Sequence, residues 1–191
     1  MKKEAKPVCI ISFSGRKNGS CQNIGRFIQN YYGENSVLFC FSNFKISSCN
    51  DCSYECFSKD VTCPHSSDME QTLVESILSS KLTYFIVPNY CDFPCSNYFA
   101  FCERQQSYFQ NHSGQLNSYN TISKRFIAVT NTNQEHFKYA FSCHVNGTPD
   151  ILYLSAKKYG KISLNGDLLS SVQAKEDILA FLSHSSHTIL L

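Results

Sequence analysis

Residues 8–13 read VCIISF and residues 14–21 read SGRKNGSC, and this junction decides the fold. The apolar run has the length of a buried strand, and the pattern after residue 21 is helical. A loop of glycine, hydroxyl and basic residues joins them. In such a strand–loop–helix unit, backbone N–H groups of the loop and of the first helical turn bind an anion such as phosphate. Arg16 can donate two hydrogen bonds to phosphate oxygens, although Gly, Ser and Asn are also ordinary turn residues.

The composition is that of a globular chain without an extreme charge. The chain has 191 residues, of which 42% are hydrophobic, so it can bury a substantial core. Its net charge of +2 is too small to attract nucleic acid or an anionic membrane by charge alone. We therefore expect a single domain over residues 1–191, with no nucleic-acid and no membrane partner.

The cysteine content is high for the compartment that the sequence predicts. No apolar run reaches the length of a membrane-spanning helix, and residues 1–7 lack the apolar core of a signal peptide, so we expect a cytoplasmic protein. Eleven cysteines is an odd number, and thiols stay reduced in the cytosol, which disfavours a disulfide framework. Cys9 and Cys40 lie in apolar runs and are expected in the core.

Strand-like runs alternate with helical patterns along the whole chain. This alternation predicts an α/β fold, a parallel sheet with helices on both faces. The clearest helix is amphipathic over residues 69–78, with Asp68 as its expected N-cap, whereas residues 157–167 read as an exposed loop or hairpin. Strands are predicted at 8–13, 36–41, 82–87, 125–130 and 150–154, and further helices at 21–32, 96–109, 134–145 and 173–183.

Polar strand ends place a candidate binding site at one edge of this sheet. Ligands of open α/β sheets bind beyond the carboxyl ends of the strands. The third predicted strand runs into PNYC at residues 88–91, and the fourth runs into TNTN at residues 130–133. The ring of Tyr90 can lie against a planar heterocycle, although Pro-Asn is also a common turn signal. Together with the loop after the first strand, these ends predict one shared site.

The order of these motifs resembles the flavodoxin-like NAD(P)H-dependent FMN reductase family, including its iron–sulfur flavoprotein branch. The opening G-S-P-R-x-x-G-N-T loop of the family corresponds to residues 13–21, its D-D-M helix start to residues 67–69, and its P-x-Y strand end to residues 88–90. The family's K-x-F-x-D-R segment corresponds to residues 99–104. The match covers most of residues 7–131. It implies a flavodoxin-like three-layer sandwich with a five-stranded parallel sheet of order 2-1-3-4-5.

The resemblance implies FMN as the cofactor, with the flavin supplying the redox chemistry. The loop after the first strand would bind its phosphate, the P-x-Y segment would border its ring, and the end of the fourth strand would approach the far side. The family's Asn-Thr pair is Ser20-Cys21 here, which removes one hydroxyl. The cofactor-binding residues that the resemblance implies are Ser14, Arg16, Asn18, Ser20, Cys21 (through its backbone N–H), Pro88, Asn89, Tyr90, Cys91, Thr130 and Asn131.

A cysteine-rich loop at about residues 47–66 carries a second constellation, C-x2-C-x3-C-x6-C. Four thiolates within such a short segment can bind zinc or an iron–sulfur cluster. Iron–sulfur flavoproteins hold a [4Fe–4S] cluster in this loop, so the resemblance implies one here, although the spacing has one residue more than theirs. Zinc, a redox dithiol of the first two cysteines, and plain thiols are the alternatives. The candidate ligands are Cys49, Cys52, Cys56 and Cys63, whereas His136, His144, His184 and His187 have no ligand spacing.

Two functions from different classes follow. The first is an FMN-binding oxidoreductase or electron-transfer flavoprotein that takes electrons from NAD(P)H or ferredoxin and reduces a small acceptor such as a quinone or flavin. The second is a flavodoxin-fold metal-binding or partner-binding module that has lost strong FMN binding. The departures from the family at Phe13, Gly15, Cys21 and Phe99 favour the second. No acid–base catalytic residue is expected, and the resemblance implies a homodimer or homotetramer.

Overall fold

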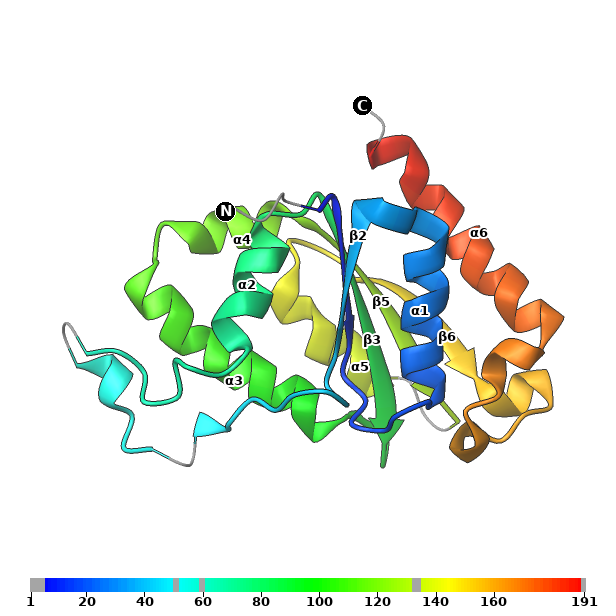
Figure 1. Ribbon diagram of the computed structural model, residues 1–191, viewed down its shortest axis with the longest axis horizontal. Helices are drawn as coiled ribbons and strands as arrows, with labels where there is room; N and C mark the ends of the chain where they lie inside the picture. Colours follow the sequence, from blue (N-terminus) through cyan, green and yellow to red (C-terminus); the bar gives the residue numbers. More distant parts are fainter. Residues whose placement is uncertain (1–5, 50–51, 59–60, 132–134, 190–191) are drawn as a thin grey trace.

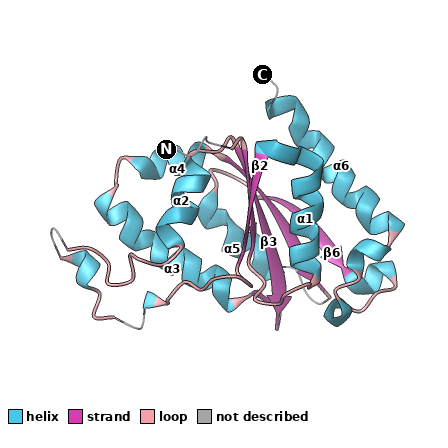
Figure 2. Ribbon diagram, viewed as in Figure 1, coloured by secondary structure: helices cyan, strands magenta, loops and turns pink. Residues whose placement is uncertain are grey.

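The computed structural model describes residues 6–49, 52–58, 61–131 and 135–189 (Figure 1). A central sheet separates two layers of helices (Figure 2). Its five parallel strands lie in the order β2-β1-β3-β5-β6, which confirms the predicted α/β fold and the 2-1-3-4-5 order of the parallel strands. The strands are β1 (Val8–Ser12), β2 (Ser36–Cys40), β3 (Leu82–Tyr90), β5 (Ser123–Thr130) and β6 (Asp150–Ser155).

The helices cover the two faces of the sheet unequally. On one face lie α2, α3, α4 and α5, and on the other lie α1 and α6 (Figure 1). Among the described residues, no helix is both long and apolar enough to cross a membrane. The helices are α1 (Ser20–Tyr32), α2 (Glu70–Leu78), α3 (Ser96–Asn111), α4 (Gln115–Thr121), α5 (Glu135–Phe141) and α6 (Val172–Ile189).

Each face of the sheet has its own hydrophobic core. The core beneath α2, α3 and α5 is rich in aromatic rings, and the core beneath α1 and α6 is mainly aliphatic. Phe13, which stands where the family has glycine, is fully buried and packs against Phe41 and Phe85 with ring centroids 5.0 and 5.5 Å apart. A fully buried Phe contributes about 1.5–3 kcal/mol to stability, so this departure builds the core. Cys9 and Cys40 are buried, as predicted.

A short hairpin extends the third strand beyond its predicted end. The two-residue strand β4 (Phe93–Pro94) pairs antiparallel with the end of β3. The turn between them has positive φ at Cys91 (51°) and Asp92 (68°), the pattern of tight hairpin turns. The side chain of Asn89 stabilises this turn, because its Oδ1 accepts a hydrogen bond of 2.9 Å from the backbone N–H of Asp92.

Several other elements depart from the predicted boundaries. Helix α4 was not predicted, and the helix expected over 134–145 is α5 followed by a 3-10 turn, η4 (Ser142–His144); residue 134 itself lies outside the described residues. Asp68 precedes α2 and accepts the Glu70 N–H at 3.0 Å, although Met69 occupies the N-cap position. The segment expected as an exposed loop or hairpin contains two 3-10 turns instead, η5 (Ala156–Tyr159) and η6 (Ser163–Asn165).

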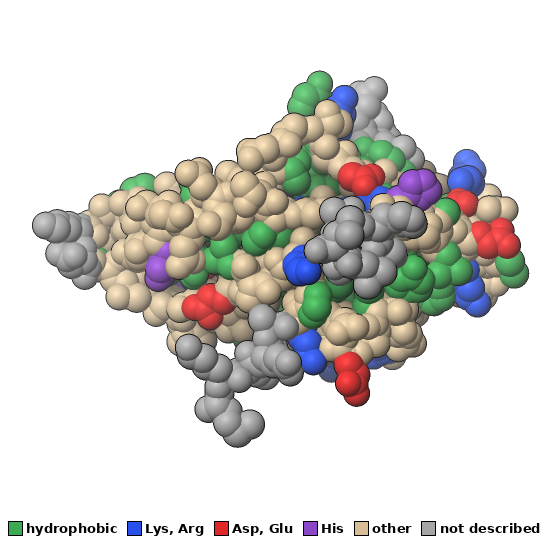
Figure 3. Space-filling model, turned by 90° about the horizontal axis from the view of Figure 1, so that it is seen from above, with side chains coloured by type: hydrophobic (Ala, Val, Ile, Leu, Met, Phe, Trp, Pro, Cys, Tyr) green, Lys and Arg blue, Asp and Glu red, His purple; other side chains and the backbone are tan. Residues whose placement is uncertain are grey.

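The charged side chains do not segregate by sign on the face at the amino ends of the strands. There, basic and acidic side chains of the described residues are interspersed (Figure 3). This distribution agrees with the small net charge of the sequence.

Candidate functional site

A cavity of about 270 Å³ lies at the carboxyl edge of the sheet. Its walls come from the loop after β1, the start of α1, the end of β3 and the residue after β5. Nine of the eleven residues that the sequence predicts for a cofactor line this one cavity: Ser14, Arg16, Ser20, Cys21, Pro88, Asn89, Tyr90, Cys91 and Asn131.

Local hydrogen bonds fix the loop that leads into α1. Ser14 Oγ accepts the backbone N–H of Arg16 at 3.2 Å, and the Gln22 side chain accepts that of Asn18 at 2.6 Å. Asn18 has a φ of 56°, which reverses the chain before Gly19. Gly19 is the N-cap of α1 and provides no side-chain cap, so the first N–H groups of the helix remain available to an anion.

The hydroxyl of Ser20 is a buried polar group at the edge of this cavity. Ser20 is 6% exposed, and its buried Oγ has no hydrogen-bond partner among the residues that the structure describes. A buried hydroxyl without a partner costs about 1–3 kcal/mol. The Ser20 hydroxyl, the first N–H groups of α1 and the guanidinium of Arg16 together form a donor set that fits a phosphate. The hydroxyl of Ser20 therefore partly replaces the one that is absent at Cys21.

The end of β3 forms the opposite wall of the cavity. Tyr90 is 51% exposed, so one face of its ring is free to lie against a ligand. Partial burial raises the pKa of Tyr90, and this rise is opposed by Arg16 and by a hydrogen bond to Ser14. Behind Tyr90, the Asn89 amide donates a 2.5 Å hydrogen bond to Thr130 Oγ1, which joins the end of β3 to the end of β5.

Two of the predicted residues do not line the cavity. Thr130 is 2% exposed and supports Asn89 from behind. The side chain of Asn18 accepts a hydrogen bond of 3.4 Å from Arg26, and its carbonyl accepts one from Asn23. Both residues therefore shape the site rather than contact its interior. Two residues of the fourth strand-end loop, Thr132 and Asn133, lie outside the described residues.

Ser163 and Leu164 complete the cavity wall, and sequence reasoning missed them. The guanidinium of Arg16 donates a hydrogen bond to the carbonyl of Leu164, and the Asn131 amide donates one of 2.6 Å to Ser163 Oγ. Gly160 and Gly166 marked this segment only as a loop. Nothing in its composition indicated that it packs against a loop some 150 residues earlier.

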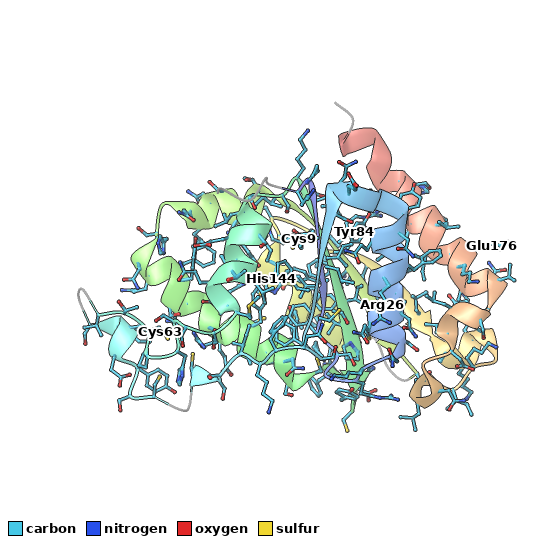
Figure 4. All side chains as sticks on the ribbon, viewed as in Figure 1. Cys9, Arg26, Cys63, Tyr84, His144 and Glu176 are labelled. Carbon is cyan, nitrogen blue, oxygen red and sulfur yellow. The ribbon has the colours of Figure 1, made fainter. Side chains whose placement is uncertain are left out.

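The cysteine-rich loop encloses a second cavity, of about 430 Å³. All four predicted ligands line it, together with His65, Glu103 and Arg104. Figure 4 shows Cys63 in this loop, which extends beyond α3 at the left of the view. The predicted ligand set is Cys49, Cys52, Cys56 and Cys63.

Arg104 holds the two ends of the cysteine-rich loop together. Its side chain is 1% exposed and forms an ion pair of 2.6 Å with Asp68. It also donates to the carbonyl of Ser47 at 3.0 Å and to that of His65 at 3.2 Å. Burial is the largest single influence and lowers the pKa of Arg104, but the hydrogen bond to Asp68 and the nearby negative charges together outweigh it, so the pKa is raised. The guanidinium is therefore a permanent buried cation at the loop.

The sulfur atoms in this cavity are spread too far apart for a preformed zinc site. Zinc–sulfur bonds of 2.3 Å in a tetrahedron place sulfur atoms about 3.8 Å apart. Among the described residues, no three of the four loop sulfurs lie within 4.8 Å of one another. Burial raises the pKa of Cys49 and of Cys56, so both are thiols at neutral pH.

Comparisons with known proteins identify the fold. No family model matches the chain, and no curated protein matches it by sequence. The solved structure of the Trp repressor binding protein from Bacillus subtilis superposes with a TM-score of 0.58 at 15% identity, over 87% of this chain and 94% of that one. FerB, a flavoenzyme NAD(P)H:(acceptor) oxidoreductase from Paracoccus denitrificans, superposes with a TM-score of 0.52 at 14% identity, over 93% of this chain and 96% of that one. The chain therefore has a flavodoxin-like α/β fold.

Proposed function

We propose that the chain is an FMN-dependent oxidoreductase that transfers electrons from NAD(P)H or ferredoxin to a small acceptor such as a quinone or a flavin. The observation that carries the proposal is the cavity at the carboxyl edge of the sheet, where the unpartnered hydroxyl of Ser20 lies at the start of α1. FerB, which has the same fold, is named as an NAD(P)H:(acceptor) oxidoreductase.

The roles of the chain's own residues follow from their chemistry. Ser20 and the first N–H groups of α1 would hold the FMN phosphate, and Arg16 would neutralise its charge. Pro88 and Tyr90 would border the ring system and keep water from one side of it. Bound flavin would supply the hydride and electron transfer.

A comparison of FMN with riboflavin tests the proposal directly, because riboflavin lacks the phosphate. FMN should bind the purified protein with a shift in flavin absorbance and a change in its fluorescence. Arg16→Ala should weaken FMN binding by about 10–100-fold, the usual contribution of a charged hydrogen bond. The same substitution should leave riboflavin binding nearly unchanged.

Lys17→Ala is the matched control, since Lys17 is also an exposed basic residue of the loop but does not line the cavity. It should leave the affinity for FMN within about twofold, the size of a screened surface charge effect. A protein that gains no flavin absorbance when incubated with FMN would contradict the proposal. Equal losses of FMN and riboflavin affinity in Arg16→Ala would contradict the assigned phosphate contact.

The cysteine-rich loop is proposed to carry a [4Fe–4S] cluster beside this flavin. Four thiols line one cavity whose sulfur spacing exceeds that of a single zinc ion, and thiolates are the preferred ligands of such clusters. A cluster bound by four thiolates is anionic, and the buried guanidinium of Arg104 would stabilise it. In this form of the protein, ferredoxin is the favoured donor.

Iron and sulfide analysis after purification without oxygen tests the cluster. The unaltered protein should contain about four irons per chain and a broad absorption shoulder, as a [4Fe–4S] centre requires. Cys52→Ser and Cys56→Ser should each lose that iron, whereas Cys91→Ser, an exposed thiol of the other cavity, should retain it. Iron content unaffected by the two loop substitutions would exclude those thiols as ligands, and bound zinc would favour the alternative metal.

The domain organisation, location and assembly of the protein are also proposed. We propose one domain that includes the cysteine-rich loop, a cytoplasmic location and assembly into a homodimer or homotetramer. Anaerobic reduction of the FMN-loaded protein by NADPH, by NADH and by reduced ferredoxin would identify the donor. Sedimentation of the purified chain would give its assembly, and a purely monomeric chain would contradict that part.

The competing function is a metal-binding or partner-binding module with weak affinity for FMN. The loss of one hydroxyl at Cys21 favours it, because the buried sulfur there is a poor partner for phosphate. The FMN titration separates the two functions, since the module would bind FMN no better than riboflavin.

A further inference from the structure

A third group of candidate ligands lies outside both the proposed flavin cavity and the cysteine-rich cavity, and it consists of Cys102, Cys143 and His144. Cys102 lies on α3, and the other two lie in the 3-10 turn η4 that follows α5. Among the described residues, this is the one group of three or more Cys, His, Asp or Glu side chains whose ligand atoms all lie within 4.8 Å of one another. Figure 4 shows His144 inside the molecule, on the α3 side of the sheet and well away from Cys63.

The spacing of these atoms matches the edge of a metal tetrahedron. Cys102 Sγ lies 3.5 Å from His144 Nε2. With zinc–sulfur and zinc–nitrogen bonds of their usual lengths, tetrahedral geometry separates the two ligand atoms by about 3.5 Å. The third atom, Cys143 Sγ, lies within 4.8 Å of both, so a small rotation of its exposed side chain completes the set. In the described part of the cysteine-rich loop, no three of the four sulfurs lie within 4.8 Å of one another.

A buried hydrogen-bond chain holds the imidazole of His144 in place. The Gln105 amide donates to Tyr119 Oη at 2.7 Å, and Tyr119 Oη lies 2.9 Å from His144 Nδ1. His144 itself is fully buried, with the rings of Phe85 and Tyr98 packed edge-on against it. Histidine ligands of metals almost always have such a partner on the nitrogen that does not bind the ion.

The same hydrogen bonds can accommodate the imidazole proton of His144 both without a metal and with one bound. Because Tyr119 Oη accepts from Gln105, its own hydrogen is free to be donated to His144 Nδ1, which leaves the imidazole proton on Nε2, facing Cys102. When Nε2 binds a metal, the imidazole proton resides on Nδ1 and is donated to a lone pair of Tyr119 Oη. The same two residues therefore support both the free and the metal-bound histidine.

The cluster can be reached from outside. Cys143 is exposed and lines a surface pocket of about 350 Å³ together with Gln105, Phe109 and Tyr119. An ion can enter by this route, and water can occupy its fourth position. Two thiolates balance the charge of a divalent ion, so a site with the ion bound is neutral. Neutrality suits a site whose histidine is fully buried.

We propose that Cys102, Cys143 and His144 bind one Zn²⁺ ion, with the fourth position open to water. Two thiolates and one imidazole are the ligand types that favour zinc over magnesium or calcium. Such an ion would join η4 to α3 and so stabilise the α5–β6 connection against the helical layer. The site does not depend on the proposed FMN or iron–sulfur binding.

Cobalt titration of the full chain under nitrogen tests this proposal, since Co²⁺ replaces Zn²⁺ and its thiolate complexes absorb visible light. Cys143→Ser is compared with Cys91→Ser, because both remove one exposed thiol and both leave the cysteine-rich loop intact. We expect Cys91→Ser to bind as many equivalents of Co²⁺ as the unaltered protein. We expect Cys143→Ser to lose one equivalent or to bind it at least about 100-fold more weakly, more than removal of an outer-shell partner costs.

Alkylation provides a second measurement in case a variant folds poorly. In the unaltered protein, Zn²⁺ should protect Cys143 from N-ethylmaleimide, and this protection should disappear in Cys102→Ser. Tyr119→Phe should retain the ligands and weaken Zn²⁺ binding about 10–100-fold through the loss of its hydrogen bond. Equal cobalt binding by Cys143→Ser and Cys91→Ser would overturn the proposal, as would alkylation of Cys143 that Zn²⁺ does not slow.

Discussion

The two cavities that are proposed to bind cofactors have walls of different kinds. The proposed flavin cavity is bounded by the ends of paired strands and by the start of a helix, so the backbone ladder of the sheet fixes its walls. The cysteine-rich cavity is bounded by a loop, whose two ends are joined to α3 mainly by one buried side chain, Arg104. A single substitution should therefore disrupt the cysteine-rich cavity more readily than the proposed flavin cavity.

Replacing Arg104 should have the largest effect. Arg104→Met removes the cation that pairs with Asp68 in a mostly buried site, which should destabilise the fold by about 3–5 kcal/mol in urea unfolding. The variant should also lose iron or zinc from the cysteine-rich loop while its folded fraction still binds FMN. Arg26→Met, at an exposed arginine of α1, is the control and should change stability by less than about 1 kcal/mol. Equal loss of FMN and metal in Arg104→Met would show that the two cavities are coupled.

Glu70 offers a pH-dependent test of the same region. It is 3% exposed, and its Oε1 has no hydrogen-bond partner in the described part of the chain. Burial raises its pKa to about 7 against the opposing effect of Arg104. Between about pH 4.5 and 7 the folded chain retains a proton that the unfolded chain loses, so stability falls as the pH rises. Glutamine cannot ionise, so Glu70→Gln should not lose stability as the pH rises. The variant should be about 3 kcal/mol more stable than the unaltered protein at pH 8.

The stability difference for Glu70→Gln should shrink toward zero at pH 4.5. Glu75→Gln, at an exposed position of the same helix, provides the control for a charge removed from α2. A gain from Glu70→Gln that is the same at both pH values would contradict the raised pKa.

A pair of glycine substitutions tests the rim of the flavin cavity. Gly166 and Gly160 both have positive φ, 72° and 64°, so alanine is strained at either position. Only at Gly166 would the new Cβ approach another segment, at 2.5 Å from the carbonyl oxygen of Asn18, whereas nothing lies within 4 Å at Gly160. Gly166→Ala should therefore cost about 2 kcal/mol more than Gly160→Ala in urea unfolding and should alone weaken FMN binding. Equal effects would mean that the rim does not shape the cavity.

Removing the Asn89 side chain should have the smallest effect. Asn89→Ala loses the hydrogen bonds to Thr130 and to the turn at Asp92, which together contribute about 1–2 kcal/mol. FMN binding should weaken by a similar free energy, because Asn89 fixes the backbone that positions the neighbouring Tyr90. Metal content of the cysteine-rich loop should not change, and a loss of metal would contradict the separation of the two cavities.

Sequence reasoning succeeded where the information is local or periodic. Buried runs such as residues 8–13 identify strands by their length, and the order of the parallel strands follows from their alternation with helices. The rule that ligands bind beyond the carboxyl ends of parallel strands then identified most of the residues that line the cavity. Each of these inferences needs only neighbours in the sequence or a rule of topology.

It failed where distant segments meet through single side chains. Thr130 stays a predicted ligand, but no local pattern indicated that it lies behind Asn89, because that position depends on the register between β3 and β5. His144 was given no role because its partner Cys102 lies 42 residues away. The contact of Arg16 with Leu164 spans 148 residues, and no local pattern encodes it.

That last contact has a consequence for the order of events during synthesis. The segment 163–166 reaches the ribosome exit roughly 7–30 s after the loop at residues 14–20, at ordinary rates of about 5–20 residues per second. Until then, Arg16 and Asn23 lack the carbonyl groups of Leu164 and Gly166. A nascent chain that has already paired its first four parallel strands would still present an open groove in place of the cavity. Cofactor binding would then have to wait until segment 163–166 has been synthesised.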